Sequence, residues 1–327
     1  MSIPKTMRVV EMREPGGPET LQIGSWPTPE ATAEEVLVRV IAAGVNGPDL
    51  VQRRGHYPPP KGASPLLGLE VSGEVVVADA AGRWSVGDHV VALTNGGGYA
   101  EFVAVRADHC LPVPAGVSDV DAAGLPETYF TVWSNIFFGH DIPKGANFLA
   151  HGGAGGIGST AIQLGNLKGL QVFTTAEPGD DCAFCTDLGA ARAIDFRNED
   201  FVPILREAGG AAVILDTIGG DYIARNIKSA TPDARIVQLA FNAGSRVEID
   251  LMPVMLKRIT YTGSTLRSRP DAFKAAVAAD LCTQVWPHFA DGALRPVTYA
   301  VLPLDGAGEA HAMMEAAKHR GKILLTP

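Results

Sequence analysis

The sequence has 327 residues, of which 46% are hydrophobic and 19% charged, and its formal net charge is −9. This length and composition predict a folded chain of two domains and exclude wholesale disorder. The acidic balance, with no basic run, argues against a nucleic-acid or membrane-surface partner. We find no secretory signal, no apolar stretch of roughly eighteen residues and only four scattered cysteines, so we expect a cytoplasmic protein that does not span a membrane.

The first third of the chain is rich in strands and turns. Its β-branched runs are separated by clusters of Gly and Pro, with little helical spacing between them. This pattern predicts a compact, antiparallel, barrel-like domain. The expected strands lie at residues 6–12, 34–44, 69–78, 88–94 and 99–107.

From residue 125, short apolar strands alternate with segments of helical spacing. Such alternation predicts an α/β fold, with a doubly wound parallel sheet covered by helices on both faces. The six expected strands lie at residues 147–151, 171–177, 191–196, 212–217, 234–240 and 259–264. The tail does not fit this pattern and is expected to return to the first domain. We therefore predict a β-rich domain of residues 1–124 and 270–327 around a dinucleotide-binding domain of residues 125–269.

A glycine-rich turn, HGGAGGIG, directly follows the first strand of the second domain. Its G-x-G-x-x-G pattern allows a tight turn at Gly153, approach of a pyrophosphate at Gly155 and close helix packing at Gly158. Amides at the helix start would hold phosphates, and Glu177, after the next strand, would bind the ribose hydroxyls. A tight turn without a ligand is the alternative. The predicted cofactor residues here are Gly153, Ala154, Gly155, Gly156, Ile157, Gly158 and Glu177.

These motifs, with others on both sides, resemble the zinc-independent quinone oxidoreductase family of the medium-chain dehydrogenase/reductase superfamily. The similarity runs nearly end to end, through GVNGPDLVQRRGHYPPPKGASPLLGLEVSGEV, VGDHVVALTNGGGYAEFV, LPETYFTVW, HGGAGGIG and GSTLRSR. The most similar subgroup is the one that contains the p53-inducible quinone oxidoreductase. The resemblance implies a GroES-like catalytic domain in two pieces around a Rossmann domain, an NADPH or NADH cofactor, a small quinone substrate and a homodimer.

The resemblance also implies roles for particular side chains. Asn46 and Tyr57 would contact the substrate and donate hydrogen bonds to an oxygen that becomes negative; Tyr57 could also stack on a flat ring. The alternatives are a turn residue at Asn46 and a tyrosine that fixes the proline-rich loop at Tyr57. Arg267 would reach substrate or cofactor, or form an ion pair at a surface or dimer edge. The other implied cofactor contacts are Thr131, Phe241, Asn242 and Gly244.

Zinc is not expected. The zinc-dependent relatives have cysteine at the position of Asn46 and histidine at that of Leu69, and an amide and an aliphatic side chain cannot build the nitrogen and sulfur shell of zinc. Glu70 is then expected to form a salt bridge. The C-x-x-C spacing of Cys182 and Cys185 falls on a predicted helix, where packing is favoured over redox chemistry.

The choice of cofactor depends on Glu177. The family commonly uses NADPH, whereas a carboxylate at this position binds a free ribose diol and repels a 2′-phosphate. Arg197 could partly compensate, so we expect a shift toward NADH with NADPH still possible. The leading hypothesis is an NAD(P)H-dependent quinone oxidoreductase. The alternatives are an enoyl or 2-alkenal reductase, a cofactor-binding protein with little turnover and, least favoured, a zinc alcohol dehydrogenase.

Overall fold

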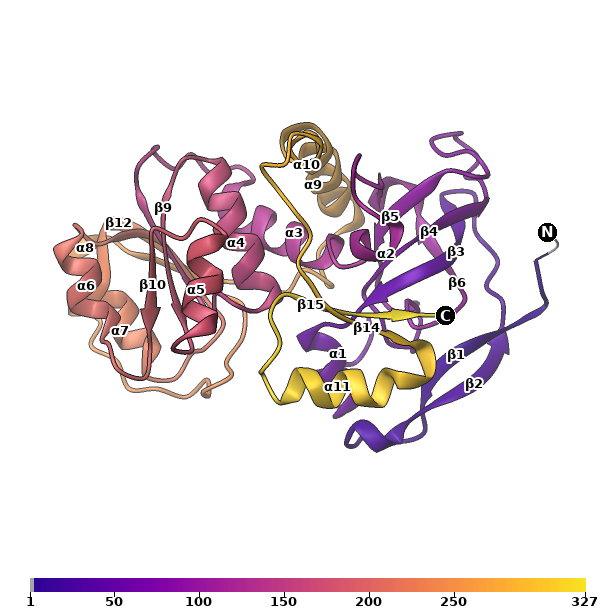
Figure 1. The fold of residues 1–327 in the computed structure, drawn as a ribbon, viewed down its shortest axis with the longest axis horizontal. Coiled ribbons are helices and arrows are strands. Elements are labelled where there is room, and N and C mark those ends of the chain that lie inside the picture. Colours follow the sequence, from indigo (N-terminus) through magenta and orange to yellow (C-terminus); the bar gives the residue numbers. More distant parts are fainter. Residues whose placement is uncertain (1–2) are drawn as a thin grey trace. The chain divides into compact units, whose positions relative to one another are not determined.

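The computed structural model describes residues 3–327, which form two compact units (Figure 1). Unit 1 contains the chain up to Phe130 and the segment Arg267–Pro327, and unit 2 contains Thr131–Leu266. The second boundary lies ahead of the predicted one, so Arg267 belongs to unit 1, whereas Thr131 begins unit 2. No helix within residues 3–327 is long and apolar enough to cross a membrane.

Unit 1 is built on a seven-stranded, mainly antiparallel sheet with the order β14-β15-β3-β4-β5-β7, in which β6 also pairs with β3. Buried aliphatic side chains of these strands form its core. Both strands of the tail belong to this sheet: β15 pairs with β3, and β14 pairs with β15. The strands are β3 (Glu35–Gly44), β4 (Glu70–Val77), β5 (His89–Leu93), β6 (Phe102–Arg106), β7 (Cys110–Pro112), β14 (Thr298–Pro303) and β15 (Lys322–Thr326).

Several elements of unit 1 are not predicted from the sequence patterns, and two of them, a strand and a short helix, show why. Strand β2 (Leu21–Pro27), which pairs with β1 (Thr6–Met12), contains a glycine and ends in proline, so it does not read as a β-branched run. Helix α1 (Gly47–Arg53) is short and begins with Gly-Pro, but it starts with a capping box between Asn46 and Asp49. The other helices of unit 1 are α2 (Asp119–Ala122), α3 (Pro126–Val132), which ends in unit 2, α9 (Asp271–Gln284), α10 (Pro287–Ala290) and α11 (Ala307–Glu315).

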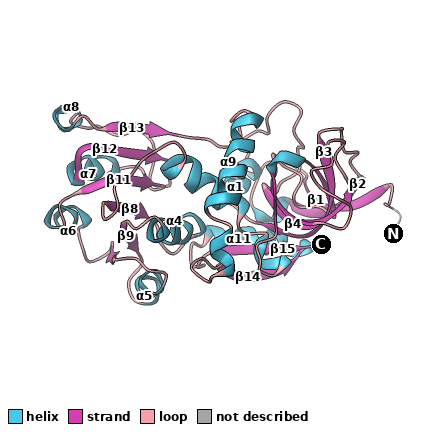
Figure 2. Cartoon of the chain, turned by 90° about the horizontal axis from the view of Figure 1, so that it is seen from above, coloured by secondary structure: helices cyan, strands magenta, loops and turns pink. Residues whose placement is uncertain are grey.

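Unit 2 contains a six-stranded parallel sheet in the order β10-β9-β8-β11-β12-β13. Counted along the chain this is the 3-2-1-4-5-6 order of a Rossmann fold, so the predicted architecture is confirmed. The strands are β8 (Asn147–His151), β9 (Gln171–Ala176), β10 (Arg192–Asp195), β11 (Ala211–Asp216), β12 (Ala230–Gln238) and β13 (Thr260–Gly263). The helices are α4 (Gly156–Leu167), α5 (Asp180–Asp187), α6 (Phe201–Glu207), α7 (Tyr222–Ser229) and α8 (Met252–Lys257). Helices α4 and α5 lie on one face of the sheet and α6 and α7 on the other (Figure 2).

Candidate functional site

The glycine-rich turn of unit 2 joins β8 to α4, where the sheet order switches from β8 to β11. The left-handed residue is Gly152, with φ of +73°, rather than Gly153, so the tight turn lies one residue before its predicted place. A Cβ on Gly158 would lie 2.2 Å from the carbonyl oxygen of Gly152, so close helix packing requires glycine there. A Cβ on Gly155 would meet only that oxygen, at 3.7 Å. The backbone at Gly155 is therefore open to a close approach by a ligand.

Helix α4 has the properties of an anion-binding site. Its N-cap is Gly155, and no side chain caps it. The first N–H groups of a helix have no acceptor within the helix, and together with the helix dipole they attract phosphate. Ala154 is buried and Ile157 is half-buried, so both side chains pack within the protein at the turn.

The two cysteines of the C-x-x-C motif have no disulfide bond. Cys185 is fully buried on α5, and a Cβ on Gly153 would lie 2.8 Å from its Sγ and 2.3 Å from Oγ1 of Thr174. Gly153 is therefore required because β9 and α5 pack directly under the turn. Burial raises the pKa of the half-buried Cys182, which disfavours its thiolate. The predicted packing role is confirmed for Cys185.

The end of β9 carries a bidentate ion pair. Arg197 donates hydrogen bonds from Nε and Nη2 to the two carboxylate oxygens of Glu177, the second over 2.6 Å. Both side chains are exposed enough to meet a ligand, at 38% for Glu177 and 61% for Arg197. The hydrogen bonds from Arg197 lower the pKa of Glu177. The predicted acid and the predicted compensating base are thus brought together.

The loops after β11 and β12 lie side by side. Gly220 donates its N–H to the Gly244 carbonyl oxygen over 2.8 Å, and Ala243 donates to that of Ile218 over 2.7 Å. These bonds hold the predicted cofactor segment, in which Phe241 is 46% exposed. Asn242 and Gly244 are also exposed. Thr131 is buried, and its carbonyl oxygen accepts from Nδ2 of Asn135.

In unit 1, Asn46 belongs to a buried polar cluster. Its Nδ2 donates to Oε1 of Glu70 over 2.9 Å and to the Gly44 carbonyl oxygen over 3.3 Å. Its Oδ1 accepts from Nζ of Lys322, which also lies 2.7 Å from Oε1 of Glu70 and 3.2 Å from the Val45 carbonyl oxygen. The predicted salt bridge of Glu70 is confirmed. The amide of Asn46 is already fully hydrogen-bonded within the protein.

This cluster does not fit a zinc ion. It offers one carboxylate and one amide, without thiolate or imidazole, and the Lys322 ammonium already uses the acceptors. Leu69, at the position of the zinc relatives' histidine, is buried and aliphatic. Within residues 3–327, no group of three or more His, Cys, Asp or Glu side chains is arranged to hold a metal ion.

Tyr57 is the substrate candidate with an uncommitted polar group. Its ring is half-buried, and its hydroxyl makes no hydrogen bond with a residue of the described segment 3–327. Burial raises its pKa, which the Arg267 charge opposes, so the hydroxyl is a proton donor at neutral pH. The guanidinium of Arg267 lies over the ring, 5.4 Å from its centroid.

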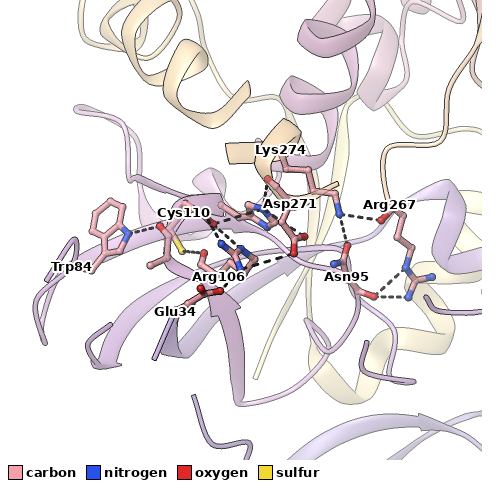
Figure 3. A network of polar contacts seen from close by, with 11 residues as sticks. Glu34, Trp84, Asn95, Arg106, Cys110, Arg267, Asp271 and Lys274 are labelled. Atoms are coloured by element: carbon pink, nitrogen blue, oxygen red, sulfur yellow. Dashed lines mark hydrogen bonds and ion pairs between the residues drawn. The ribbon is translucent and has the colours of Figure 1, made fainter. Parts of the chain in front are cut away.

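Arg267 is held in place by three other groups. It donates from Nε and Nη2 to the Asn95 carbonyl oxygen over 3.0 and 2.6 Å, and from Nη1 to Oε1 of Gln52 over 2.7 Å. Lys274 joins them by donating to Oδ1 of Asn95 and to the Arg267 carbonyl oxygen (Figure 3). Arg267 therefore acts inside unit 1, where its guanidinium lies over the Tyr57 ring, and it forms no salt bridge with a residue of the described segment 3–327.

Beneath Asn46, a second buried chain extends to α11. Asp49 accepts from the N–H groups of Asn46 and Gly68 and from the Tyr99 hydroxyl. Tyr99 contacts Nε2 of His311 at 3.2 Å, and Nδ1 of His311 lies 3.2 Å from Nη1 of Arg53. Burial raises the pKa of Asp49 to about 6 and lowers that of His311 to about 3. Neither Lys322 nor this chain was predicted; the Asn46–Asp49 capping spacing is its only local sequence signal.

Family comparisons agree with both units. Residues 32–115 match the alcohol dehydrogenase GroES-like domain, and residues 188–325 match the family described as zinc-binding dehydrogenase. The human quinone oxidoreductase is 29% identical over 338 residues, covering 98% of each chain. The chain spans only 15% of another relative, a phenolphthiocerol/phthiocerol polyketide synthase of Mycobacterium tuberculosis, with 26% identity over 97% of its own length.

Two solved structures share the fold over nearly the whole chain. The Escherichia coli quinone oxidoreductase complexed with NADPH is 25% identical, with a TM-score of 0.85 over 98% of this chain and 100% of that one. The CurK enoyl reductase is also 25% identical, with a TM-score of 0.85 over 99% of both chains. The chain therefore belongs to the medium-chain dehydrogenase/reductase superfamily and within it is similar to the quinone oxidoreductases.

Proposed function

We propose that the protein is an NAD(P)H-dependent reductase that transfers a hydride to a quinone. The observation that carries this proposal is the uncapped start of α4 behind Gly155, at the switch between β8 and β11. A bare helix start at that position fits the pyrophosphate of a dinucleotide. The full-length similarity to a human quinone oxidoreductase supports the substrate class.

Unit 2 would hold the cofactor, and the bound reduced nicotinamide supplies the hydride. The open backbone at Gly155 and the helix start would bind the pyrophosphate, and the pair of Glu177 and Arg197 would bind the ribose end. The further proposed contacts are Thr131, Gly153, Ala154, Gly156, Ile157, Gly158, Phe241, Asn242 and Gly244.

In unit 1 we propose Tyr57 as the residue that donates a hydrogen bond to the substrate oxygen. Its hydroxyl is protonated and uncommitted, and Arg267 holds its ring. Asn46 is the second candidate, because donation to a substrate would compete with its bonds to Glu70 and Gly44. Reduction by hydride leaves an oxyanion, and a hydrogen-bond donor at that oxygen lowers the barrier. No metal is required for this step.

An enoyl reductase is the second candidate, because the CurK enoyl reductase shares the fold over 99% of both chains. The two activities use the same hydride donor and differ in the atom that accepts the hydride. A cofactor-binding protein with little turnover is the candidate of another class. The uncommitted Tyr57 hydroxyl favours a catalyst over it.

The test compares initial rates of NADH and NADPH oxidation with 1,2-naphthoquinone and with a 2-alkenal. Quinone turnover supports the proposal; turnover of the alkenal alone, with saturation of its double bond, assigns the protein to the enoyl reductases. Cofactor binding without oxidation on either substrate favours the non-enzyme. Tyr57→Phe is expected to lower kcat/KM about tenfold, as for loss of one hydrogen bond to a developing charge. Tyr299→Phe, at an exposed tyrosine of unit 1, is the matched control.

We further propose a cytoplasmic homodimer that acts without zinc. The four free cysteines fit a reducing compartment. Elemental analysis of the purified protein is expected to give no stoichiometric zinc, and treatment with a chelator is expected to leave the rate unchanged.

A further inference from the structure

A buried chain of hydrogen bonds connects the glycine-rich turn to the loop after β11. His151, the last residue of β8, is 1% exposed. Its Nδ1 lies 3.0 Å from Oγ1 of Thr175, which accepts the N–H of Gly152 over 3.3 Å. Its Nε2 lies 2.8 Å from Oδ1 of Asn226, whose Nδ2 donates to Oδ2 of Asp216 over 2.9 Å.

The carboxylate at one end sets the direction of every hydrogen bond in this chain. Asp216 accepts two further bonds from the backbone N–H groups of residues 218–219. Because a carboxylate only accepts, Asn226 must turn its nitrogen toward Asp216 and its oxygen toward His151. That oxygen requires a donor, so His151 carries its proton on Nε2. Its Nδ1 then accepts the hydroxyl proton of Thr175, whose oxygen remains available to the Gly152 N–H.

The surroundings of His151 keep it neutral and in one orientation. Its ring meets those of Phe201 and Tyr222 edge to face, with centroids 4.9 and 4.8 Å away. Burial lowers the pKa of His151, and the charge of Arg225 on α7 acts in the same direction. The Asp216 carboxylate opposes both. The chain of hydrogen bonds requires a neutral imidazole, because Nδ1 must accept from Thr175 while Nε2 donates to Asn226.

We propose that His151 is a positioning residue for the dinucleotide: it fixes the glycine-rich turn relative to the loop after β11, residues 217–220, which in turn holds the proposed cofactor segment at residues 241–244. Strands β8 and β11 are neighbours in the sheet, and the two loops follow their carboxyl ends. The His151 side chain acts on the two loops indirectly. It contacts Thr175, which bonds to the glycine-rich turn, and Asn226, which bonds to Asp216 at the start of the loop after β11. If both loops are already ordered before the dinucleotide binds, its binding free energy is not reduced by the entropy cost of ordering them. This inference rests on the proposed use of a nicotinamide cofactor and adds a residue to it.

The test measures NADH and NADPH dissociation constants for the wild-type protein and for Thr175→Val and Asn226→Leu. Each substitution is close in shape and removes one side-chain partner of His151, while the Thr175 carbonyl oxygen keeps its bonds to the N–H groups of Gly152 and Gly153. The expected effect is a loss of affinity of about 10- to 100-fold, as for a buried partner left without its hydrogen bond. Because the chain acts as a unit, the double variant should lose little more than the worse single one. Thr186→Val, at an exposed threonine of α5 that bonds its own helix, is the matched control.

A second measurement determines the protonation state and tautomer of His151 in the wild-type protein. Its imidazole ¹⁵N chemical shifts should report a neutral ring protonated on Nε2, with the same tautomer in the presence and absence of NADH. A ring protonated on Nδ1 would overturn the inference even if the variants failed to fold. Unchanged affinity in both folded variants would overturn it while the proposed function stood. Failure of the wild-type protein to bind either cofactor would instead remove the proposed function, and this inference with it.

Discussion

Arg197 donates hydrogen bonds from two nitrogens, Nε and Nη2, to the carboxylate of Glu177 at the carboxyl end of β9. This ion pair changes how Glu177 and Arg197 would each bind the ribose end of the cofactor. A paired Glu177 still accepts from a ribose diol, whereas a 2′-phosphate must draw Arg197 away from it. The observed pair therefore supports the prediction that NADH is preferred and NADPH still accepted.

Glu177→Ser should reverse this preference. It removes the negative charge and frees Arg197 to bind a 2′-phosphate, so the ratio of kcat/KM for NADPH to that for NADH should rise about tenfold. Arg197→Ala should lower the same ratio, because it leaves the carboxylate unpaired. Arg192→Ala breaks a comparable exposed pair with Glu199 and serves as the control. A ratio that stays constant in both variants would contradict this role of the pair.

A second prediction concerns the buried ion pair of Lys322 and Glu70. Lys322→Met leaves the fully buried Glu70 carboxylate without its counter-charge, at a cost of about 3–5 kcal/mol in the free energy of unfolding. The loss should appear as a lower midpoint of chemical denaturation. Adding Glu70→Gln should recover part of it, because the uncompensated charge is then gone. Lys318→Met, at an exposed lysine, should have no effect, and a Lys322→Met protein as stable as the wild type would refute the assignment.

The sequence predicts the sheets of this protein better than its polar clusters. The strands of unit 2 are apolar runs and their order follows from a repeated βαβ pattern, so local composition was sufficient. Lys322 and Glu70 are remote in the chain and meet only because β15 and β4 both flank β3. His151 reads from sequence as a core residue at a strand end, since its partners come from β9 and α7. Such partners become known only when the fold brings the elements together.

Two buried groups of one hydrogen-bonded chain should give opposite dependences of stability on pH. The pKa of His311 falls from 6.5 to about 3 on folding, so the unfolded chain binds the extra proton between these values. Stability from His311 is thus present above pH 6.5 and is lost as pH falls toward 3. The pKa of Asp49 rises from 3.8 to about 6, so the folded protein binds the proton first and stability falls as pH rises from 3.8 to 6.

Single variants should separate these two contributions. Relative to the wild type, His311→Gln should gain stability as the pH is lowered from 6 to 4, because the penalty for charging His311 is removed. Asp49→Asn should lose stability over the same range. The measurement is the free energy of unfolding in urea at several pH values, with His56→Gln, at an exposed histidine, as the control. Slopes of the same sign in both variants would show that the chain does not titrate as described.

The last prediction concerns the assembly of unit 2. Strand β13 is the terminal strand of the sheet, pairing only with β12 among the described residues, and α8 lies next to it (Figure 2). Four large apolar side chains there are between 55% and 65% exposed, namely Leu251, Met252, Met255 and Leu256. An open strand edge beside an apolar patch is suited to a second copy related by a two-fold axis, which pairs both edges and covers both patches. Met255→Lys combined with Leu256→Glu should therefore convert a dimer into a monomer in light scattering. Val86→Lys, at an exposed valine of unit 1, should leave the mass unchanged, and a double variant that remains dimeric would exclude this surface as the interface.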